Sequence, residues 1–191
     1  MRIAVIGAGN IGGTLGGKWA AAGHEVVYGL RDPAQNPAGR PFAEALEGAD
    51  AVLLALPGTA VVDFVRAQAG GLDGKVVVDA TNNIRAPEFN SLPVLAATIP
   101  AAHIYRAFNS LGWDVLAEPE VGGVQADMFY AGPEGRGQQV VESLIADAGL
   151  RPVRVGGIDK ANVVDGVLAL WFTLSGTRGR RIAFSLVQDP A

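Results

Sequence analysis

Short apolar runs alternate along the chain with segments that have the spacing of helices. Strands of a parallel sheet are covered on both faces, so they appear in sequence as continuous apolar runs. Such runs occupy residues 2–6, 25–28, 51–56, 76–78, 103–108, 126–131 and 152–155. Helical spacing is found in residues 11–22, 42–47, 59–69, 134–148 and 158–174. This alternation predicts an α/β fold with a doubly wound, mainly parallel sheet.

A glycine-rich turn lies between the first predicted strand and the first predicted helix. Gly7, Gly9 and Gly12 form a G-x-G-x-x-G motif at this point. Gly7 permits a tight turn, Gly9 lets the backbone approach a pyrophosphate, and Gly12 lets the helix pack closely on the strand. The amide groups at the start of that helix would face the phosphates. Strand, glycine turn, helix and strand together predict a Rossmann-like unit that binds a dinucleotide.

The end of the second strand bears on which dinucleotide is bound. Proteins that bind NAD(H) usually have Asp or Glu there, which holds the ribose 2′-hydroxyl. Here Gly29 stands near that position, and Arg31 follows, where its guanidinium could pair a 2′-phosphate. We therefore expect NADP(H). NAD(H) remains the alternative if the strand extends further and Asp32 is the ribose-binding acid, or if Arg31 is a solvated surface residue.

Several residues mark the expected ends of elements. Thr59 can cap the helix that follows the run at 51–56, and Gly70 with Gly71 is expected to end that helix. Residues 32–41 contain three prolines and predict a loop. Pro152 restricts the last strand to an edge of the sheet or to a strand start.

The predicted helix at residues 158–174 is apolar on more than one face, which predicts contact with a second subunit. We divide the chain into a dinucleotide-binding domain, residues 1–155, and a C-terminal helix and tail, residues 156–191. The second segment is expected to form the contact of a homodimer. The tail carries Arg178, Arg180 and Arg181. These arginines either form a solvated basic tail or reach an anionic acceptor in the neighbouring subunit.

Composition excludes several classes of function. The 191 residues are 49% hydrophobic, which is enough for a substantial core in one large domain. A net charge of −4 argues against a nucleic-acid or anionic-membrane partner. The absence of Cys excludes disulfides and thiolate catalysis, and two isolated His residues do not suggest a metal site. No apolar segment reaches the roughly 20 residues of a membrane span, so we expect a cytoplasmic protein.

Ligands of doubly wound sheets bind at the carboxyl ends of the strands, and the candidate site residues follow from this rule. The expected cofactor-binding residues are Gly7, Ala8, Gly9, Asn10, Ile11, Gly12, Leu30, Arg31, Leu56, Pro57, Ala80, Thr81 and Asn82. Candidates for contact with the substrate or the carboxamide are Asn82, Asn109 and Ser110. Each Asn could instead be a turn residue that bonds its own backbone. No catalytic residue is assigned, because hydride transfer between stacked rings requires chiefly proximity and orientation.

Four other residues that could take part in catalysis are less suitable because of their expected positions. His24 and His103 are expected at the opposite edge of the sheet, and Tyr105 and Trp171 are expected in the core.

At its strand ends the chain resembles the NADPH-dependent oxidoreductase family that includes coenzyme F420:NADP+ oxidoreductase. The matching segments cover most of the chain in order: residues 2–12, 23–32, 79–82, 107–112 and 150–153. The resemblance implies direct hydride transfer between NADP(H) and a deazaflavin such as coenzyme F420. In that family a Ser or Thr before the arginine helps to hold the 2′-phosphate, whereas this chain has Leu30. Asn83 stands where the family commonly has Pro, on the substrate side.

Three functions are therefore open. The first is an NADP(H)-dependent oxidoreductase that acts on a deazaflavin. The second is an NADP(H)-dependent reductase of a flavin, an imine or a carbonyl compound, with Tyr105 or a water molecule as proton donor. The third is a non-catalytic module that senses NADP(H) and signals through its dimer.

Overall fold

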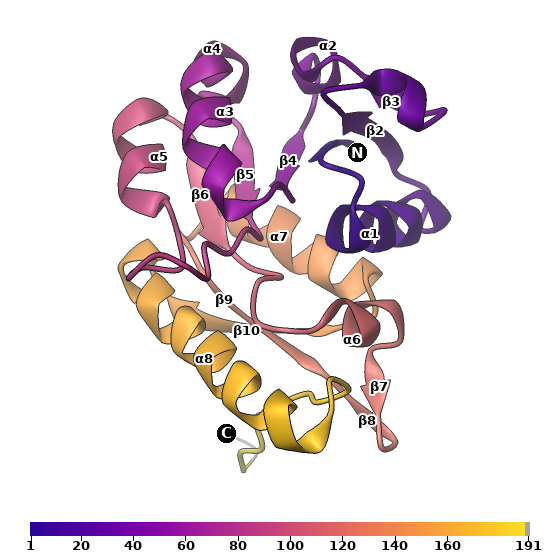
Figure 1. The fold of residues 1–191 in the computed structure, drawn as a ribbon, viewed down its shortest axis with the longest axis vertical. Coiled ribbons are helices and arrows are strands. Elements are labelled where there is room, and N and C mark those ends of the chain that lie inside the picture. The colour runs from indigo at the N-terminus through magenta and orange to yellow at the C-terminus, as the bar shows by residue number, and fades with distance from the viewer. Residues whose placement is uncertain (190–191) are drawn as a thin grey trace.

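A mixed sheet of eight strands lies at the centre of the fold, with helices on both of its faces (Figure 1). The computed structural model describes residues 1–189. Residues 190–191 of the expected C-terminal tail lie outside this range. The strands are ordered β10-β9-β6-β5-β4-β1-β2-β3 across the sheet. This arrangement confirms the predicted Rossmann-like α/β fold.

The strands of the large sheet are β1 (Arg2–Ile6), β2 (Glu25–Gly29), β3 (Gly39–Arg40), β4 (Ala51–Leu54), β5 (Val76–Asp79), β6 (His103–Arg106), β9 (Asp127–Ala131) and β10 (Arg151–Gly156). A separate hairpin pairs β7 (Glu120–Val121) with β8 (Val124–Gln125). The α-helices are α1 (Asn10–Ala21), α2 (Phe42–Leu46), α3 (Val61–Ala67), α4 (Ala69–Leu72), α5 (Leu92–Thr98), α6 (Trp113–Ala117), α7 (Arg136–Asp147) and α8 (Ala161–Arg178). Short 3₁₀ turns are η1 (Pro33–Gln35), η2 (Gly58–Ala60) and η3 (Ile158–Lys160).

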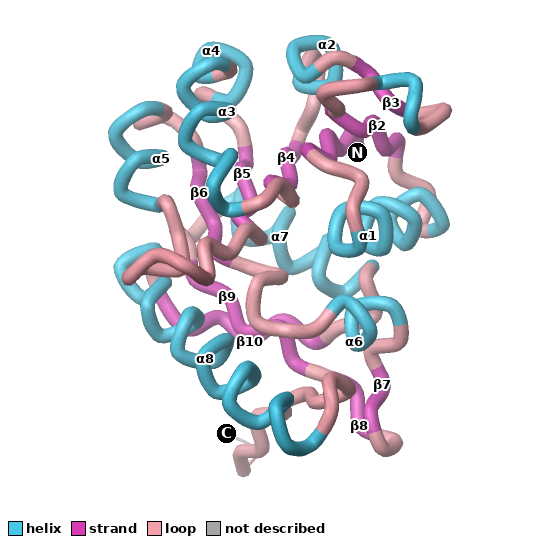
Figure 2. The backbone as a smooth tube through the Cα atoms, in the orientation of Figure 1, coloured by secondary structure: helices cyan, strands magenta, loops and turns pink. Residues whose placement is uncertain are grey.

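Two hydrophobic clusters hold the helices on the sheet. Alternate residues of β1 illustrate the division, because Ile3 and Val5 belong to one cluster while Ala4 and Ile6 belong to the other. The first cluster includes side chains of α1, α6 and α7. The second includes side chains of α2, α3, α4, α5 and α8. The result is a three-layer sandwich whose layers can be followed in Figure 2.

The strand β9 changes direction relative to the rest of the sheet. Neighbouring strands are parallel except β6 and β9, which are antiparallel and meet at the single pair Arg106–Ala131. Both residues end their strands, so β9 and its parallel neighbour β10 project past the carboxyl ends of the other strands. Helix α8 contacts β9 and therefore lies on the ligand-binding side of the sheet (Figure 1).

Some local expectations were wrong. Thr59 is exposed and does not cap α3, which begins at Val61 after the η2 turn and has no side-chain cap. The helix ends at Ala67, and Gly70 and Gly71 lie inside the next short helix, α4, rather than ending α3. A Cβ on Gly71 would lie 3.0 Å from Leu46 Cδ1, so close packing between α4 and α2 accounts for this glycine.

Two further boundaries differ from the prediction. The proline-rich loop contains a short edge strand, β3, because the backbone of Gly39 and Arg40 pairs with β2. The last helix begins at Ala161, after the η3 turn, and continues to Arg178. Within residues 1–189, none of the helices has the length and hydropathy needed to cross a membrane.

Candidate functional site

The glycine turn forms an open cradle at the start of α1. Gly7 has φ +105°, and a Cβ there would lie 2.6 Å from the Ala55 carbonyl oxygen. A Cβ on Gly12 would lie 2.0 Å from the Gly7 carbonyl oxygen, whereas Gly9 has nothing within 4 Å. Helix α1 has no side-chain cap at Gly9, so the amides of its first turn remain available to an anion. This geometry fits a dinucleotide pyrophosphate.

The end of β2 leaves no room for a ribose-binding acid. The strand ends at Gly29, where a Cβ would lie 2.6 Å from Ile6 Cδ1 and 3.3 Å from Phe42 Cδ1. Asp32 lies beyond the strand, and its carboxylate accepts a hydrogen bond from the Ala34 amide at 3.2 Å. Asp32 was expected to hold the ribose only if this strand extended further, and β2 does not reach it.

Arg31 lies beside a pocket at this strand end. The pocket has a volume of about 330 Å³ and is lined by Gly7, Gly29, Leu30, Arg31, Asp32, Phe42 and Leu56. The Arg31 side chain is exposed and makes no hydrogen bond or ion pair with any residue in the described part of the chain. Its guanidinium is free to pair a 2′-phosphate. Leu30 is half-buried and packs against the core.

The loops that follow β4 and β5 are in contact with each other. A Cβ on Gly58 would lie 2.5 Å from the Asn82 carbonyl oxygen, so the two backbones are in direct contact. Leu56 is half-buried and Pro57 is exposed at this junction. Ala80 and Thr81 are buried, and the Thr81 hydroxyl donates to Asp79 Oδ1 at 2.6 Å.

Arg106, at the end of β6, organises a buried polar cluster that the sequence analysis missed. Its Nη1 donates to Asp79 Oδ2 at 3.0 Å and also to the Thr81 carbonyl oxygen. Its Nη2 donates to Asn82 Oδ1 at 2.8 Å. Its Nε and Nη2 both donate to Asp165 Oδ1 of α8. The side chains of Arg106 and Asp79 have no solvent exposure.

The predicted substrate residues Asn109 and Ser110 are part of this interior. Asn109 is 2% exposed, and its Nδ2 donates to Asp165 Oδ1 at 3.1 Å. Asn109 Oδ1 is buried and has no hydrogen-bond partner. Ser110 is 1% exposed. Asn82 is half-buried, so of the three predicted substrate residues it is the most accessible from the cleft.

Phe108 precedes these residues in an unusual conformation. Among the described residues it alone combines a positive φ, +61°, with a side chain other than glycine. Backbone strain of this kind is typical of functional sites. The Phe108 amide donates to Met128 Sδ at 3.1 Å, and its ring packs edge-on against Trp19.

Burial affects the ionisable groups around the site. Burial raises the pKa of Asp79, against the opposing effects of Arg106 and the Thr81 hydrogen bonds. Burial also raises the pKa of Tyr105 to about 12. The Tyr105 hydroxyl donates to the Pro133 carbonyl oxygen, and the residue has no exposed surface. Tyr105 is therefore a core residue, as expected, and unsuited to proton donation near neutral pH.

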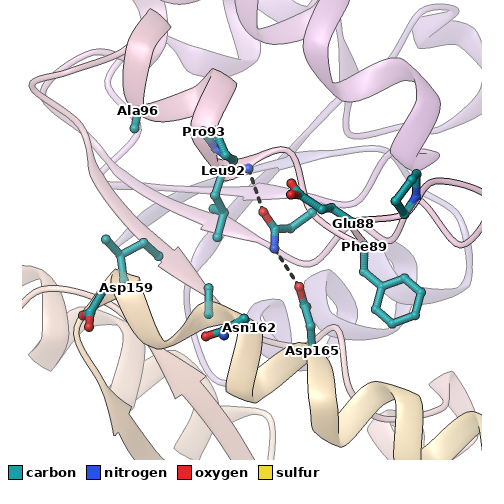
Figure 3. Close-up of a pocket in the computed structure, with 12 residues that line it drawn as sticks. Glu88, Phe89, Leu92, Pro93, Ala96, Asp159, Asn162 and Asp165 are labelled. Atoms are coloured by element: carbon teal, nitrogen blue, oxygen red, sulfur yellow. Dashed lines mark hydrogen bonds between the residues drawn. The ribbon is translucent and has the colours of Figure 1, made fainter.

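A larger pocket adjoins the polar cluster. It has a volume of about 530 Å³ and lies between the segment 87–96 and the start of α8. Figure 3 shows Glu88 and Phe89 on one side, with Asp159, Asn162 and Asp165 on the facing side. Asn90 bridges the two sides, because its Nδ2 donates to Asp165 Oδ2 while its Oδ1 accepts from the Leu92 amide.

The remaining sequence candidates lie elsewhere. His24 Nε2 is 2.8 Å from Asp147 Oδ2 on α7, which is a structural contact. His103 is exposed at the start of β6, opposite the carboxyl end. Trp171 is buried, as expected, with the Arg180 guanidinium 5.1 Å from its ring centre. Arg181 pairs with Glu118 at 2.6 Å, so it is not a free basic residue. Residues 1–189 contain no cluster of His, Asp and Glu suited to a metal ion.

A sequence signal for the missed cluster does exist. Arg106 is a charged residue within the apolar run 103–108, and Asp165 lies within the apolar helix 158–174. A charge in a segment expected to be buried must have a partner, since burying it alone is costly. Pairing these two residues would have predicted the contact between α8 and the ends of β5 and β6.

Known proteins are similar to this chain in sequence and in fold. Residues 2–83 match the family described as NADP oxidoreductase, coenzyme F420-dependent. A candidate F420-dependent NADP reductase from Arthrobacter sp. FB24 has a similar crystal structure, with a TM-score of 0.85 and 26% sequence identity. That similarity covers 98% of this chain and 100% of the other.

Two further proteins are similar over smaller parts. A hypothetical protein, SMa0349, from Sinorhizobium meliloti has a TM-score of 0.71 and 30% identity, covering 83% of this chain and 86% of the other. A glycerol-3-phosphate dehydrogenase [NAD(P)+] from Ectopseudomonas mendocina is 30% identical over 125 residues, which is 53% of this chain and 37% of that protein. The chain spans little more than a third of the length of the curated relatives it matches.

The glycine cradle, Arg31 and the carboxyl ends of β1, β2, β4 and β5 all lie within residues 2–83. Residues 2–83, which hold the glycine cradle and Arg31, match the family of coenzyme F420-dependent NADP oxidoreductases.

Proposed function

We propose that this protein transfers a hydride between NADP(H) and a deazaflavin of the coenzyme F420 type. The choice of cofactor rests on one observation, which is that Gly29 ends β2 and Arg31 follows two residues later. Packing excludes an acidic side chain at Gly29, and Arg31 offers a free guanidinium two residues later. The family description supports both NADP and coenzyme F420.

The residues at the strand ends are suited to the phosphates and the nicotinamide end of this cofactor. Gly7 to Gly12 would hold the pyrophosphate, and Arg31 would hold the 2′-phosphate. Leu56, Pro57, Ala80, Thr81 and Asn82 would surround the nicotinamide end. When bound, the reduced cofactor supplies the hydride. The protein then contributes orientation and exclusion of water, and the hydride transfer itself requires no acid from the protein.

A second acceptor class is favoured by one observation. Three carboxylates, those of Glu88, Asp159 and Asp165, are among the twelve described residues that line the 530 Å³ pocket, and none of the twelve is Lys or Arg. Asp165 is paired with Arg106 and Asp159 with Lys160, while Glu88 forms no ion pair with a described residue. Phosphate and carboxylate groups would be repelled there. A neutral or cationic acceptor, such as a carbonyl compound or an imine, is the alternative.

We also propose that residues 156–191 contact a second subunit in a homodimer. Helix α8 exposes Val163, Leu170 and Phe172, each more than 40% accessible. Exposed apolar side chains on one helix are typical of an interface. Sedimentation of the purified protein at several concentrations tests this part of the proposal, and a monomer at all concentrations would refute it.

Spectroscopy separates the proposed activities. NADPH oxidation is followed with coenzyme F420, with FMN, with a small carbonyl compound and with a cyclic imine as acceptors. Rapid oxidation with coenzyme F420 alone supports the deazaflavin reaction. Oxidation with the imine or carbonyl compound alone refutes it in favour of the second class. Tight NADPH binding without turnover of any acceptor would indicate a non-catalytic NADP(H)-sensing module.

A further inference from the structure

The guanidinium of Arg106 is the centre of the buried cluster and uses all of its nitrogens. Nε contacts Asp165, Nη1 contacts Asp79 and the Thr81 carbonyl oxygen, and Nη2 contacts Asp165 and Asn82. These partners come from the end of β5, the loop after it, and helix α8. One side chain of β6 therefore joins two segments that are distant in sequence, residues 79–82 and helix α8.

The fold alone does not require such a cluster. Removing charges from water is costly, and well-packed apolar residues of similar volume often give equal or greater stability. Asp79 and Arg106 are nevertheless fully buried, and the Asp165 side chain is only 10% exposed. The cluster also lies beside the residues predicted to surround the nicotinamide, rather than in the apolar core between the sheet and the helices. Its position points to a contribution to the site.

The hydrogen bonds of Arg106 fix the orientation of the Asn82 side chain. Arginine can only donate, so the group of Asn82 that faces it must be Oδ1. Asn82 Nδ2 is then directed to the opposite side, where it donates to the Asn109 carbonyl oxygen at 2.9 Å. Asn82 is half-buried at the carboxyl end of β5 and has one remaining amide hydrogen. Arg106 determines where that hydrogen points.

Asp165 extends this arrangement to α8 and to the pocket. Its Oδ1 accepts from Arg106 and from Asn109, and its Oδ2 accepts from Asn90 at 2.6 Å (Figure 3). Asn90 lines the 530 Å³ pocket together with Asp165 itself. The same carboxylate therefore joins the nicotinamide end of the cleft to the wall of the pocket.

We infer that Arg106 and Asp165 are positioning residues, which hold the loop of Thr81 and Asn82 and the start of α8 in the geometry that places the nicotinamide beside the pocket. This inference rests on the proposed function, because it assumes that the nicotinamide end of NADP(H) lies at Asn82. Neither residue takes part in the chemistry directly. Each acts through the groups that it holds.

A pair of ligands isolates this effect from general destabilisation. NADP+ and adenosine 2′,5′-bisphosphate share the adenosine and the 2′-phosphate, but only NADP+ has a nicotinamide. The variant Asp165→Asn keeps the size of the side chain and removes its charge. It should weaken binding of NADP+ on the order of tenfold while leaving the affinity for the bisphosphate unchanged. With an active acceptor, kcat should fall on the order of 100-fold, the loss expected for misplaced reactants.

A second ion pair in the same sheet provides the control. Asp127, at the other end of β9 from the contact with Arg106, is buried and pairs with Arg151 Nε at 2.6 Å. Asp127→Asn should lower the stability of the protein without changing the ratio of its affinities for NADP+ and for adenosine 2′,5′-bisphosphate. If Asp165→Asn does not fold, Arg106→Lys replaces it. A lysine keeps the positive charge but has three donors on a single nitrogen, in place of five donors spread over the planar fork of arginine.

The outcomes are distinct. If the wild type binds NADP+ no more tightly than NAD+, the proposed cofactor is wrong, whatever the variants do. If the wild type prefers NADP+ and the variants bind both ligands as the wild type does, the positioning role is refuted. Equal weakening of NADP+ and the bisphosphate would also refute it. Selective weakening of NADP+, absent in Asp127→Asn, supports it.

Discussion

Nε and Nη2 of Arg106 both donate hydrogen bonds to Oδ1 of Asp165, at 2.9 and 2.7 Å respectively. The two residues are 59 positions apart in the sequence. This contact connects the last residue of β6 to the helix that crosses the carboxyl edge of the sheet. The loop of Thr81 and Asn82 and the wall of the 530 Å³ pocket thus belong to one hydrogen-bonded cluster. Asn90 and Asp165 are the members of this cluster that line the pocket.

Arg31 should determine the preference for the phosphorylated cofactor. Arg31→Ala removes the charged partner of the 2′-phosphate, and charge-assisted hydrogen bonds contribute about 1.5–3 kcal/mol. The KM for NADPH should therefore rise about 10- to 100-fold, while the KM for NADH changes little. Steady-state kinetics with both nucleotides measures this. Arg66→Ala, which changes an exposed arginine in the last turn of α3, serves as a control. An equal rise for both nucleotides would refute the pairing of Arg31 with the 2′-phosphate.

Leu30 is one of the two residues, with Asn83, at which this chain departs from the family that it resembles. Leu30→Ser would add a hydroxyl donor beside Arg31 and should improve NADPH affinity about threefold to tenfold. Because Leu30 packs against the core, the same change should cost about 1–2 kcal/mol of stability. Leu30→Ala should lower the stability by a similar amount without improving the affinity for NADPH. If the two variants bind NADPH equally, the added hydroxyl does not reach the phosphate. Calorimetric titration compares them.

Gly12 should be essential for the contact between α1 and β1. In Gly12→Ala the new Cβ would lie 2.0 Å from the Gly7 carbonyl oxygen and 3.0 Å from Val5 Cγ1. The helix must then move away from the cradle, and NADP+ affinity should fall more than about tenfold, with about 1–3 kcal/mol of stability lost. Gly17→Ala in the same helix has nothing within 4 Å and should bind NADP+ normally. Normal binding by Gly12→Ala would contradict the proposed packing.

The hydrogen bond from Tyr130 to Glu142 should make stability depend on acidity. Bonds from Tyr130 and Gln138 lower the pKa of Glu142 below its ordinary value of 4.5. A carboxylate with a lowered pKa contributes stability that is present above pH 4.5 and is lost as pH falls through its folded pKa.

Tyr130→Phe should therefore cost about 1 kcal/mol at pH 7, and the cost should shrink in strong acid. Urea unfolding of wild type and variant across this pH range measures the difference. Tyr28→Phe is the control, since the Tyr28 side chain makes no hydrogen bond within the described chain, and its effect should not vary in this way. A cost for Tyr130→Phe that is constant with pH would contradict the role of Glu142.

The elements that the sequence predicts best are those with a local cause. The strands β1, β4 and β5 are continuous apolar runs, and the turn from Gly7 to Gly12 is defined by residues close together in the chain. The end of β2 at Gly29 was also predicted approximately, and with it the position of Arg31. These features depend on neighbouring residues, which a sequence displays directly.

Long-range pairing explains most of what the sequence did not predict. Asp79, Arg106 and Asp165 meet only after the sheet and α8 have formed, so no local pattern places them together. The same holds for the reversed direction of β9, which depends on the pair Arg106–Ala131. Thr59 illustrates the opposite error, because a good capping residue is left exposed when the η2 turn precedes the helix.

The most direct test of the account follows the hydride itself. NADPH that carries deuterium at the reactive C4 position is incubated with the protein and with the acceptor that oxidises it, coenzyme F420 first. Direct hydride transfer predicts that mass spectrometry finds one deuterium at the reduced carbon of the product. Direct hydride transfer would be contradicted if deuterium stays in the nucleotide whichever of the two C4 hydrogens is labelled. It would also be contradicted if the product takes up deuterium only from deuterated water.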